Sequence, residues 1–508
     1  MKKIIFITIL VFCTSCSDDF VNIAPIGTLD NATYFDTEEN ADQAIIGLYD
    51  LMQHNYGLNW NSAYFVKMLP GDDVNAGGGS STDQEQLQDI DGYVNVSIDN
   101  ISIQSNWDLF YQTIALANII INTVETGTLS NRELVLGEAK FIRAWCYFEL
   151  ATMWGDVPLR LESPSNISPD DFTLPKSPKA KIYEQVENDL KSAIAGLPDK
   201  MSVSQPFRVS KGAAKALLGK VLVFQEKYAS AITELSSVIA NPAHDLEDTP
   251  ADVWTTATEF GKESLFELGY ISTNGYDWGN FPWGGRVESN IHQQLMGPRG
   301  DGLFDVAGLG ILNGWGFNLP TSKLVMAFDT AGDIDRKAAT IATEAEIIAA
   351  GGSVNTPENI WGYEGAIRMK YVTRLSETVS DGGVSELNYS ANWRLLRYAE
   401  VLLLAAEAYN KNGQDDLALI ELNKVRNRAG LPNLSGISGN DLFEAIINEK
   451  FLELAHEGQR FWDLVRWGRA ATELAGTGYT TKNNLFPIPM TEIQLNTALS
   501  VSDQNPGY

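Results

Sequence analysis

Apolar residues recur every three or four positions along much of the chain. The clearest example is a stripe formed by Leu395, Ala399, Leu402, Ala406 and Tyr409. This spacing predicts an α-helix that buries one face. Asn412-Gly413 interrupts the pattern, and a second helical stretch then carries Leu419, Leu422 and Val425 before Gly430 and Pro432. The two stretches together predict a helical hairpin.

A similar hairpin is predicted between residues 212 and 238. Its first helix runs to Phe224, a turn falls near Glu226-Lys227, and the second helix carries Ala231, Leu235 and Val238. Its Ala-Leu-Leu-Gly and Tyr-x-x-Ala-Ile steps resemble tetratricopeptide units. A further stripe, which ends at a Gly-Asp-Val-Pro turn, is formed by Ala139, Ile142, Cys146, Leu150 and Met153. The chain is therefore expected to be mainly α-helical.

The segment between residues 241 and 392 has a different pattern. Gly and Pro recur there too often for long helices, and turns bound the short apolar runs. Three loop-like stretches concentrate aromatic residues, namely 276–285, 313–317 and 361–363. We expect function to concentrate in this irregular region.

The first sixteen residues have the layout of a lipoprotein signal. Lys2 and Lys3 precede an apolar stretch over 4–12, and Cys13-Thr14-Ser15-Cys16 follows it directly. The apolar stretch is well below the roughly 20 residues of a spanning helix. We therefore expect cleavage before Cys16 and lipidation of its thiol, which would tether the rest of the chain to a membrane. The alternative is an ordinary secreted protein in which Cys16 is incidental.

Composition describes a large globular body with an acidic surface. Hydrophobic residues make up 44% and charged residues 20% of the 508 positions, which favours a packed core over disorder. The 37 Lys and Arg against 65 Asp and Glu give a formal charge of −28. This charge argues against binding nucleic acid or an anionic membrane surface, and it suits neutral ligands. Cys13 lies in the signal and Cys16 at the anchor, which leaves Cys146 without a partner, so no disulfide framework is expected.

Catalytic motifs find little support in the sequence. His456-Glu457-Gly458 lacks the second histidine of a zinc-protease helix. The sequence contains no Gly-x-Ser-x-Gly elbow and no nucleotide-binding phosphate loop. The segment 89–92 resembles the start of a calcium loop, but the glutamate expected near the end of such a loop is missing. A solvated turn is therefore the simpler interpretation. We expect no enzyme activity, no cofactor and no metal, although a glycosidase stays an alternative because it needs only two carboxylates.

The C-terminal tract carries the most specific pattern of the chain. Residues 448–468 read NEKFLELAHEGQRFWDLVRWG, and Phe486-Pro487-Ile488-Pro489 and a terminal Asn505-Pro506-Gly507-Tyr508 follow. The tract resembles the C-terminal signature of the SusD/RagB family. The segments 138–159, with Arg143, and 396–400 share this resemblance, which therefore covers about the whole chain.

The resemblance implies a fold and a division of the chain. The implied fold is mainly α, with four tetratricopeptide-like hairpins packed against an irregular, loop-rich region. A signal peptide at 1–15 would precede a single SusD-like body at 16–508. Within this body, 16–240 would form an N-terminal part, 241–392 a loop-rich ligand-binding region, and 393–508 a C-terminal helical part.

The resemblance also implies a function without catalysis. Members of the family are lipid-anchored outer-membrane proteins of Bacteroidetes that capture glycans, or in some cases peptides, for a TonB-dependent β-barrel transporter (SusC-like). Ser17-Asp18-Asp19 resembles the acidic signal that sends such lipoproteins to the cell exterior. The expected function is therefore capture of an oligosaccharide or polysaccharide and its delivery to a partner transporter. Peptide capture and a helical scaffold without a small ligand stay open as alternatives.

Family members often carry an aromatic binding surface on loops of the irregular region and on one N-terminal loop. An indole offers an apolar face to the C–H face of a pyranose, while carboxylates and amides bond the sugar hydroxyls. The candidate ligand-binding residues are Trp60, Asp72, Asp73, Asn75, Trp278, Trp283 and Trp315. For each tryptophan the alternative is a core position beneath a loop.

Two other motifs are expected to be structural. In the C-terminal tract a core is predicted from Phe451, Leu454, Phe461, Trp462, Leu464 and Trp467. The charged residues of the same tract, Arg460, Asp463 and Arg466, are expected to pair locally. Asp333-Ile334-Asp335-Arg336 resembles an Asp-x-Arg turn of the family and is expected to serve the scaffold.

Overall fold

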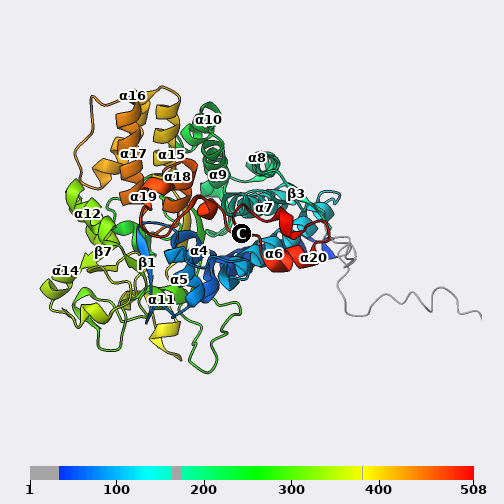
Figure 1. Cartoon of the computed structure of the whole chain (residues 1–508). Coiled ribbons are helices and arrows are strands. Elements are labelled where there is room, and N and C mark those ends of the chain that lie inside the picture. Colours follow the sequence, from blue (N-terminus) through cyan, green and yellow to red (C-terminus); the bar gives the residue numbers. More distant parts are fainter. Residues whose placement is uncertain (1–33, 163–172, 380–381) are drawn as a thin grey trace, which may run out of the picture.

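The computed structural model describes residues 34–162, 173–379 and 382–508. Long helices pack beside a region of short helices, loops and two-stranded sheets (Figure 1). This arrangement confirms the predicted fold class. The signal peptide at 1–15 and the predicted lipid anchor Cys16 lie outside the described residues. The division of the body after residues 240 and 392 stays a prediction.

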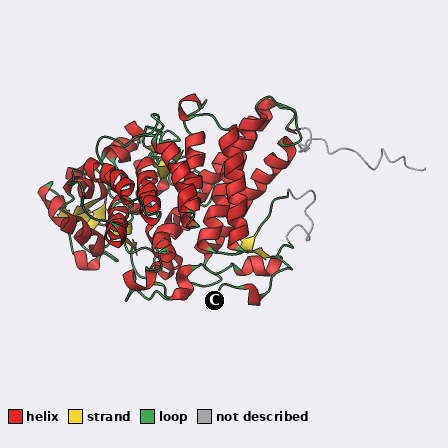
Figure 2. Ribbon diagram, turned by 90° about the horizontal axis from the view of Figure 1, so that it is seen from above, coloured by secondary structure: helices red, strands yellow, loops and turns green. Residues whose placement is uncertain are grey.

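Helix pairs form the scaffold. The pairs are α6 (Ile101–Val124) with α7 (Arg132–Met153), α9 (Lys211–Phe224) with α10 (Tyr228–Ile239), and α15 (Tyr398–Lys411) with α16 (Asp415–Arg428). The helix α8 (Lys179–Gly196) contacts both α7 and α9, and α10 contacts α15. The helices therefore form one continuous array, and Figure 2 shows many of them side by side. Both predicted hairpins belong to this array.

The α15–α16 hairpin departs from its prediction at one end. The inner positions of the predicted stripe are buried along α15, namely Ala399, Leu402 and Ala406. Leu395 instead lies in strand β10 (Trp393–Arg397), which pairs with β4 (Ser264–Leu268). Pairing with β4 keeps this stretch extended, so the helix begins only at Tyr398. Gly413 adopts a φ of 74° at the turn into α16, a conformation that glycine reaches without steric cost.

Residues between α10 and β10 form the irregular region. Its helices are short, namely α11 (Ile291–Met296), α12 (Ser322–Ala331), α13 (Ile334–Thr340) and α14 (Glu344–Ala349). Its antiparallel sheets join β5 (Phe304–Asp305) to β8 (Ser353–Val354) and β7 (Ile341–Thr343) to β9 (Ala366–Arg368). The strand β6 (Phe317–Pro320) pairs with β1 (Val74–Gly77) from the N-terminal part. N-terminal residues therefore help to build the irregular region.

The remaining elements frame these two parts. They are the helices α3 (Glu38–Gly57), α4 (Ala63–Met68), α5 (Glu85–Gly92), α17 (Gly439–Glu453), α18 (Arg460–Arg466), α19 (Ala470–Glu473) and α20 (Met490–Leu495), and the paired strands β2 (Val157–Pro158) and β3 (Lys176–Ser177). Across 34–162, 173–379 and 382–508, every helix is too short or too polar to cross a membrane.

Buried charges join the irregular region to the helical array. Glu453 of α17 accepts hydrogen bonds from Arg397 of β10 at 2.6 Å and from Arg336 of α13 at 3.0 Å, and it also pairs with Arg428 of α16. Burial alone would raise the pKa of Glu453, but the guanidinium groups around it hold the pKa well below its usual value. Arg336 Nε also donates to Asp333 at 2.6 Å, so the turn at 333–336 makes scaffold contacts.

The C-terminal tract is largely a core element, as predicted. Its buried side chains are Phe451, Leu454, Phe461, Trp462 and Leu464, while Trp467 is half-buried. Arg466 bonds Asp463 at 2.7 Å, which confirms one local pair. Arg460 departs from this expectation, because its shortest ion pair is with Asp72 at 2.7 Å, while Glu473, 13 residues away, lies at 3.5 Å. The tract therefore secures the turn that precedes β1.

Candidate functional site

Four tryptophans from distant parts of the sequence meet at one surface. Trp60 lies in a short 3-10 helix at Asn59–Asn61, Trp278 and Trp283 share the loop between β4 and α11, and Trp315 lies just before β6. The ring centroid of Trp315 is 5.5 Å from that of Trp60, 5.9 Å from that of Trp283 and 6.2 Å from that of Trp278. These ring planes differ by only 13° to 20°. We call these four residues the indole cluster.

Distances within the cluster exclude a single column of stacked rings. Parallel rings in contact are about 3.5 Å apart, so the outer rings of a column of three would be about 7 Å apart. The centroids of Trp60, Trp283 and Trp315 all lie within 6.1 Å of one another. At least two of these rings must therefore lie side by side, which makes an aromatic surface wider than one ring.

One side of the cluster is buried and the other is open to solvent. Phe281 contacts Trp283, Phe317 contacts Trp60, and both phenylalanines are buried. Trp278 is 53% exposed and Trp283 is 42% exposed. Tryptophan is highly buried on average, so these two side chains contradict the core alternative. Trp60 and Trp315 are half-buried and link the exposed rings to the core.

The loop at 276–285 is held in one conformation. Asp277 Oδ1 accepts hydrogen bonds from the two backbone N–H groups that follow Trp278, at 2.7 Å and 3.0 Å. The Asn388 side chain accepts from the backbone N–H of Tyr276 at 3.0 Å and donates to its carbonyl at 2.8 Å. A loop that is already ordered loses little conformational entropy when it binds a ligand. The exposed indoles are therefore pre-organised.

Asp72 and Asp73 are buried in the turn before β1. Arg460 Nε and Lys323 Nζ donate to Asp72 at 2.7 Å and 2.6 Å. Burial alone would raise the pKa of Asp72, but these two cations hold the pKa below its usual value. The backbone N–H of His456 donates to Asp73 at 2.8 Å, and burial raises the pKa of Asp73 to about 6. Both carboxylates thus have protein partners that secure the turn.

Asn75 of β1 also bonds protein groups. Its Nδ2 donates to the carbonyl of Gly362 and to Glu364 Oε1, both at 2.9 Å. The structure thus gives Asp72, Asp73 and Asn75 scaffold contacts, and the ligand-binding role expected for them stays a prediction.

A charged group that the sequence did not single out lies beside Trp315. Arg299 Nη1 donates to the Trp315 carbonyl at 3.3 Å, and the guanidinium lies 3.2 Å from Asp301 and 3.8 Å from Asp83. Such partly exposed charged groups can bond sugar hydroxyls beside an aromatic surface. Asp83 and Arg299 are far apart in the sequence, and no local pattern signals that they meet.

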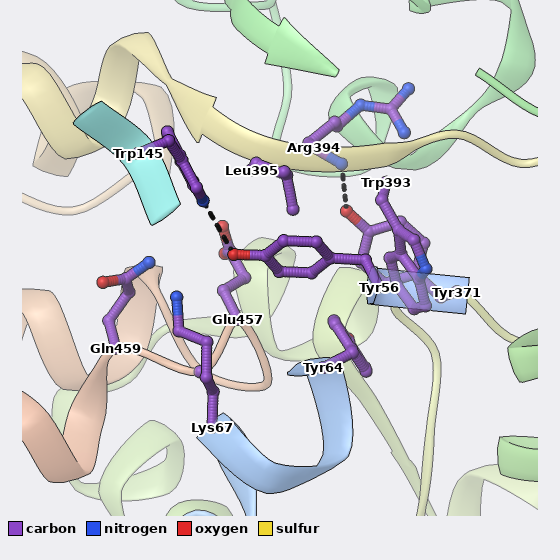
Figure 3. Close-up of a pocket in the computed structure, with 11 residues that line it drawn as sticks. Tyr56, Tyr64, Lys67, Trp145, Tyr371, Trp393, Arg394, Leu395, Glu457 and Gln459 are labelled. Carbon is purple, nitrogen blue, oxygen red and sulfur yellow. Dashed lines mark hydrogen bonds between the residues drawn. The ribbon is translucent and has the colours of Figure 1, made fainter. Parts of the chain in front are cut away.

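A small cavity lined by aromatic and charged side chains lies inside the protein, and none of the indole cluster lines it (Figure 3). Tyr56 crosses it, and its hydroxyl accepts a hydrogen bond from Trp145 Nε1 at 2.9 Å. Lys67 enters from another side in Figure 3. Its Nζ also bonds Glu149 at 2.5 Å. The cavity volume of about 20 Å³ suits a water molecule and is too small for a sugar ring. This cavity therefore offers no room for a glycan and does not compete with the indole cluster as a ligand site.

An array of helical hairpins that carries an open, pre-organised aromatic surface defines a ligand-binding protein. The family model described as the SusD family matches residues 262–483, and one described as starch-binding associating with outer membrane matches residues 19–223. A solved structure of a laminarin binding SusD-like protein shares 32% identity and a TM-score of 0.82, and the match covers 93% of this chain and 100% of that one. The chain therefore belongs to the SusD family, whose members are non-catalytic binding proteins.

Two further relatives match along nearly their whole length. A SusD-like protein P25 of Formosa agariphila is 27% identical, with 99% of each chain covered. The structure of surface glycan-binding protein A from Bacteroides fluxus is 25% identical with a TM-score of 0.78, and covers 93% of this chain and 100% of that one. Both the predicted family and the expectation of a non-catalytic protein are confirmed.

Proposed function

We propose that the protein binds a neutral glycan on the indole cluster. The observation that carries this proposal is the meeting of Trp60, Trp278, Trp283 and Trp315 from three segments far apart in the sequence. Indoles that lie side by side suit the apolar C–H faces of consecutive sugar rings. The formal charge of −28 favours an uncharged ligand over an anionic one.

Laminarin, a neutral glucan, is the expected ligand. The laminarin binding SusD-like protein resembles this chain at 32% identity and along 93% of its length. A surface glycan-binding protein of similar fold supports the wider class of ligand. Peptide capture, the alternative within the family, finds no comparable support among these relatives.

Delivery to a membrane partner completes the proposed function. Lipidation of Cys16 would hold the protein at the outer membrane, facing the exterior, and a SusC-like TonB-dependent β-barrel would receive the glycan. The signal-like residues 1–16 support the anchor, and the family model described as associating with outer membrane supports the location. The protein itself would need only to bind and release, because the partner supplies the energy of uptake.

Native affinity electrophoresis of the full chain in mild detergent tests the ligand. Gels that contain laminarin are expected to retard the protein. Trp283→Ala is expected to lower the affinity more than tenfold, because a central aromatic contact contributes about 2 kcal/mol or more. Ile420→Ala, at a position 52% exposed on α16, is the matched control and should bind like the wild type. Unchanged mobility with every polysaccharide, together with binding of oligopeptides, would establish peptide capture instead.

Cross-linking in intact cells tests the partner. Tagged protein extracted from outer membranes is expected to carry a large β-barrel protein, and Cys16→Ser is expected to release the tagged protein from the membrane fraction. Extraction without any β-barrel after cross-linking would refute the partnership and leave the ligand proposal standing.

A further inference from the structure

Trp361 is an exposed tryptophan outside the indole cluster. It follows a 3-10 helix at Pro357–Asn359, and its side chain is 43% exposed. Its Nε1 donates a hydrogen bond to Gln88 Oε1 at 2.9 Å. Because the single polar atom of the indole already has a partner, the exposed remainder is an apolar aromatic surface. This is the surface that stacking on a sugar ring requires.

Contacts from α5 fix the orientation of Trp361. Gln88 Nε2 donates to the carbonyls of Gly77 at 2.8 Å and Asp83 at 3.0 Å. The Gln88 amide is therefore held at both ends, and it holds the indole in turn. A fixed indole retains its position without a ligand, which lowers the entropic cost of binding.

The backbone brings Trp361 close to the indole cluster. A Cβ atom placed on Gly77 would lie 2.2 Å from the carbonyl oxygen of Gly316, the neighbour of Trp315. A Cβ atom placed on Gly362, the neighbour of Trp361, would lie 3.3 Å from the nitrogen of the same Gly77. The backbones next to Trp315 and Trp361 thus both approach Gly77.

Polar side chains connect the two aromatic surfaces. Arg299 bonds the Trp315 carbonyl at 3.3 Å and lies 3.8 Å from Asp83, whose own carbonyl accepts from Gln88. The side chains of Arg299 and Asp83 are 25% and 31% exposed, so they retain capacity to bond hydroxyl groups. The surface between Trp315 and Trp361 therefore presents charged hydrogen-bonding groups between two aromatic contacts.

We propose that the sugar-binding surface continues from the indole cluster across Arg299 and Asp83 to Trp361, which stacks on a distant ring of the same glycan chain. This inference rests on the proposed function. A chain too short to reach Trp361 would bind the cluster alone, so the protein would prefer long glycans. Trp361 would then determine selectivity for chain length, and the cluster would determine binding itself.

Isothermal titration calorimetry of the full chain in detergent, with laminarin and with laminaritriose, tests this inference. Trp361→Ala is expected to weaken laminarin binding about fivefold or more and to leave laminaritriose binding within about twofold of wild type. Trp283→Ala is expected to weaken the binding of both ligands. Gln88→Met removes the acceptor of the Trp361 indole N–H. It should weaken laminarin binding less than Trp361→Ala does, and it should leave laminaritriose binding unchanged.

Controls separate this inference from the proposed function and from misfolding. Trp361→Phe retains an aromatic ring and is expected to recover most of the laminarin affinity, while Ile420→Ala should match the wild type. The extension alone would be overturned by either of two results in a Trp361→Ala protein that melts like wild type. One is an equal loss of affinity for both ligands, and the other is an unchanged affinity for laminarin. If neither ligand nor any other polysaccharide binds the wild type, the proposed function fails and the extension fails with it.

Discussion

Glu453 receives side chains from three arginines, and each arginine comes from a different element of the fold. Arg336 lies on α13, Arg397 on β10 and Arg428 on α16. Each of these side chains is at most 4% exposed, so water cannot replace a lost partner. Removing one member of a buried ionic cluster leaves uncompensated charge, which costs far more than the loss of a surface pair.

Glu453→Gln is therefore expected to lower the free energy of unfolding by about 3–5 kcal/mol. Denaturation by urea measures the change. Glu184→Gln removes the charge from an exposed pair with Lys181 and serves as the control, with no measurable change expected. A Glu453→Gln protein as stable as the control would show that these buried ion pairs do not hold the irregular region to the helical array.

Asp73 carries a pH-dependent prediction. An unfolded aspartate has a pKa of about 3.9, whereas burial raises the pKa of Asp73 to about 6 in the folded protein. The folded state binds the proton more tightly, so this residue's contribution to stability is most favourable below about pH 4 and is lost as the pH rises to about 6. Asp73→Asn keeps an acceptor for the backbone N–H of His456 and removes the charge.

The variant is expected to be more stable than wild type near neutral pH by about 1–3 kcal/mol, because each unit of pKa difference corresponds to about 1.4 kcal/mol. Urea denaturation in steps from about pH 4 to about pH 7 measures how the gap widens. A gap that stays constant across this range would show that Asp73 does not titrate as its burial implies.

At the scale of elements, two glycines inside helices have opposite surroundings. A Cβ atom on Gly219 of α9 would lie 2.5 Å from the Leu235 side chain of α10, so this glycine permits the close approach of the two helices. A Cβ atom on Gly47 of α3 would meet nothing within 4 Å. The first glycine is required by packing, and the second carries only the conformational cost of glycine in a helix.

Gly219→Ala is expected to destabilise the protein by about 1–3 kcal/mol through crowding. Gly47→Ala is expected to stabilise it by about 0.5–1 kcal/mol through better helix propensity. Thermal denaturation compares the two variants with wild type. Stabilisation by both substitutions would mean that α9 and α10 pack less closely than the structure shows.

Elements with local patterns could be predicted from the sequence, and elements made by distant contacts could not. The stripe at Ala399, Leu402 and Ala406 belongs to one helix and needs no partner to be recognised. Leu395 fits the same spacing, but its pairing with β4 decides its conformation, and no local signal reveals a strand more than 100 residues away. Hydrogen bonding to a distant strand therefore overrides the helical spacing of the local apolar residues.

The candidate site divides in the same way. Aromatic residues on glycine-rich loops signal an exposed binding surface, and Trp278 and Trp283 are indeed exposed. Asp72 has the right chemistry for a sugar ligand, but its partner Arg460 is 388 residues away and only the fold brings them together. Arg299 meets Asp83 in the same non-local way. Chemistry alone therefore cannot separate a ligand-binding carboxylate from a scaffold carboxylate.

At the scale of the whole molecule, charge shapes the choice of ligand. A formal charge of −28 repels anionic polymers, and this repulsion is long-ranged only at low salt, where the screening length is about 30 Å at 0.01 M and about 10 Å at 0.1 M. Stacking of a neutral sugar on indoles involves no net charge and should not respond to salt.

The affinity for laminarin is therefore expected to change by no more than about twofold between 0.01 M and 0.1 M salt. A sulfated derivative of laminarin is expected to bind weakly at low salt, and its affinity should rise in part as salt is added. Calorimetry at the two salt concentrations measures both ligands. Tight binding of the sulfated polymer at low salt would show that local cations at the site outweigh the charge of the whole molecule.

The nearly parallel indoles also have an optical consequence. Trp60, Trp283 and Trp315 lie within 6.1 Å of one another, close enough for their electronic transitions to couple. Such coupling produces paired bands of opposite sign in the circular dichroism spectrum, and the coupling of Trp60 to the other two rings exists only when segments more than 200 residues apart are docked. A sugar that covers Trp278 and Trp283 would in addition shift their fluorescence to shorter wavelength. Circular dichroism would therefore report the docking of these segments, and tryptophan fluorescence would report the binding of a sugar.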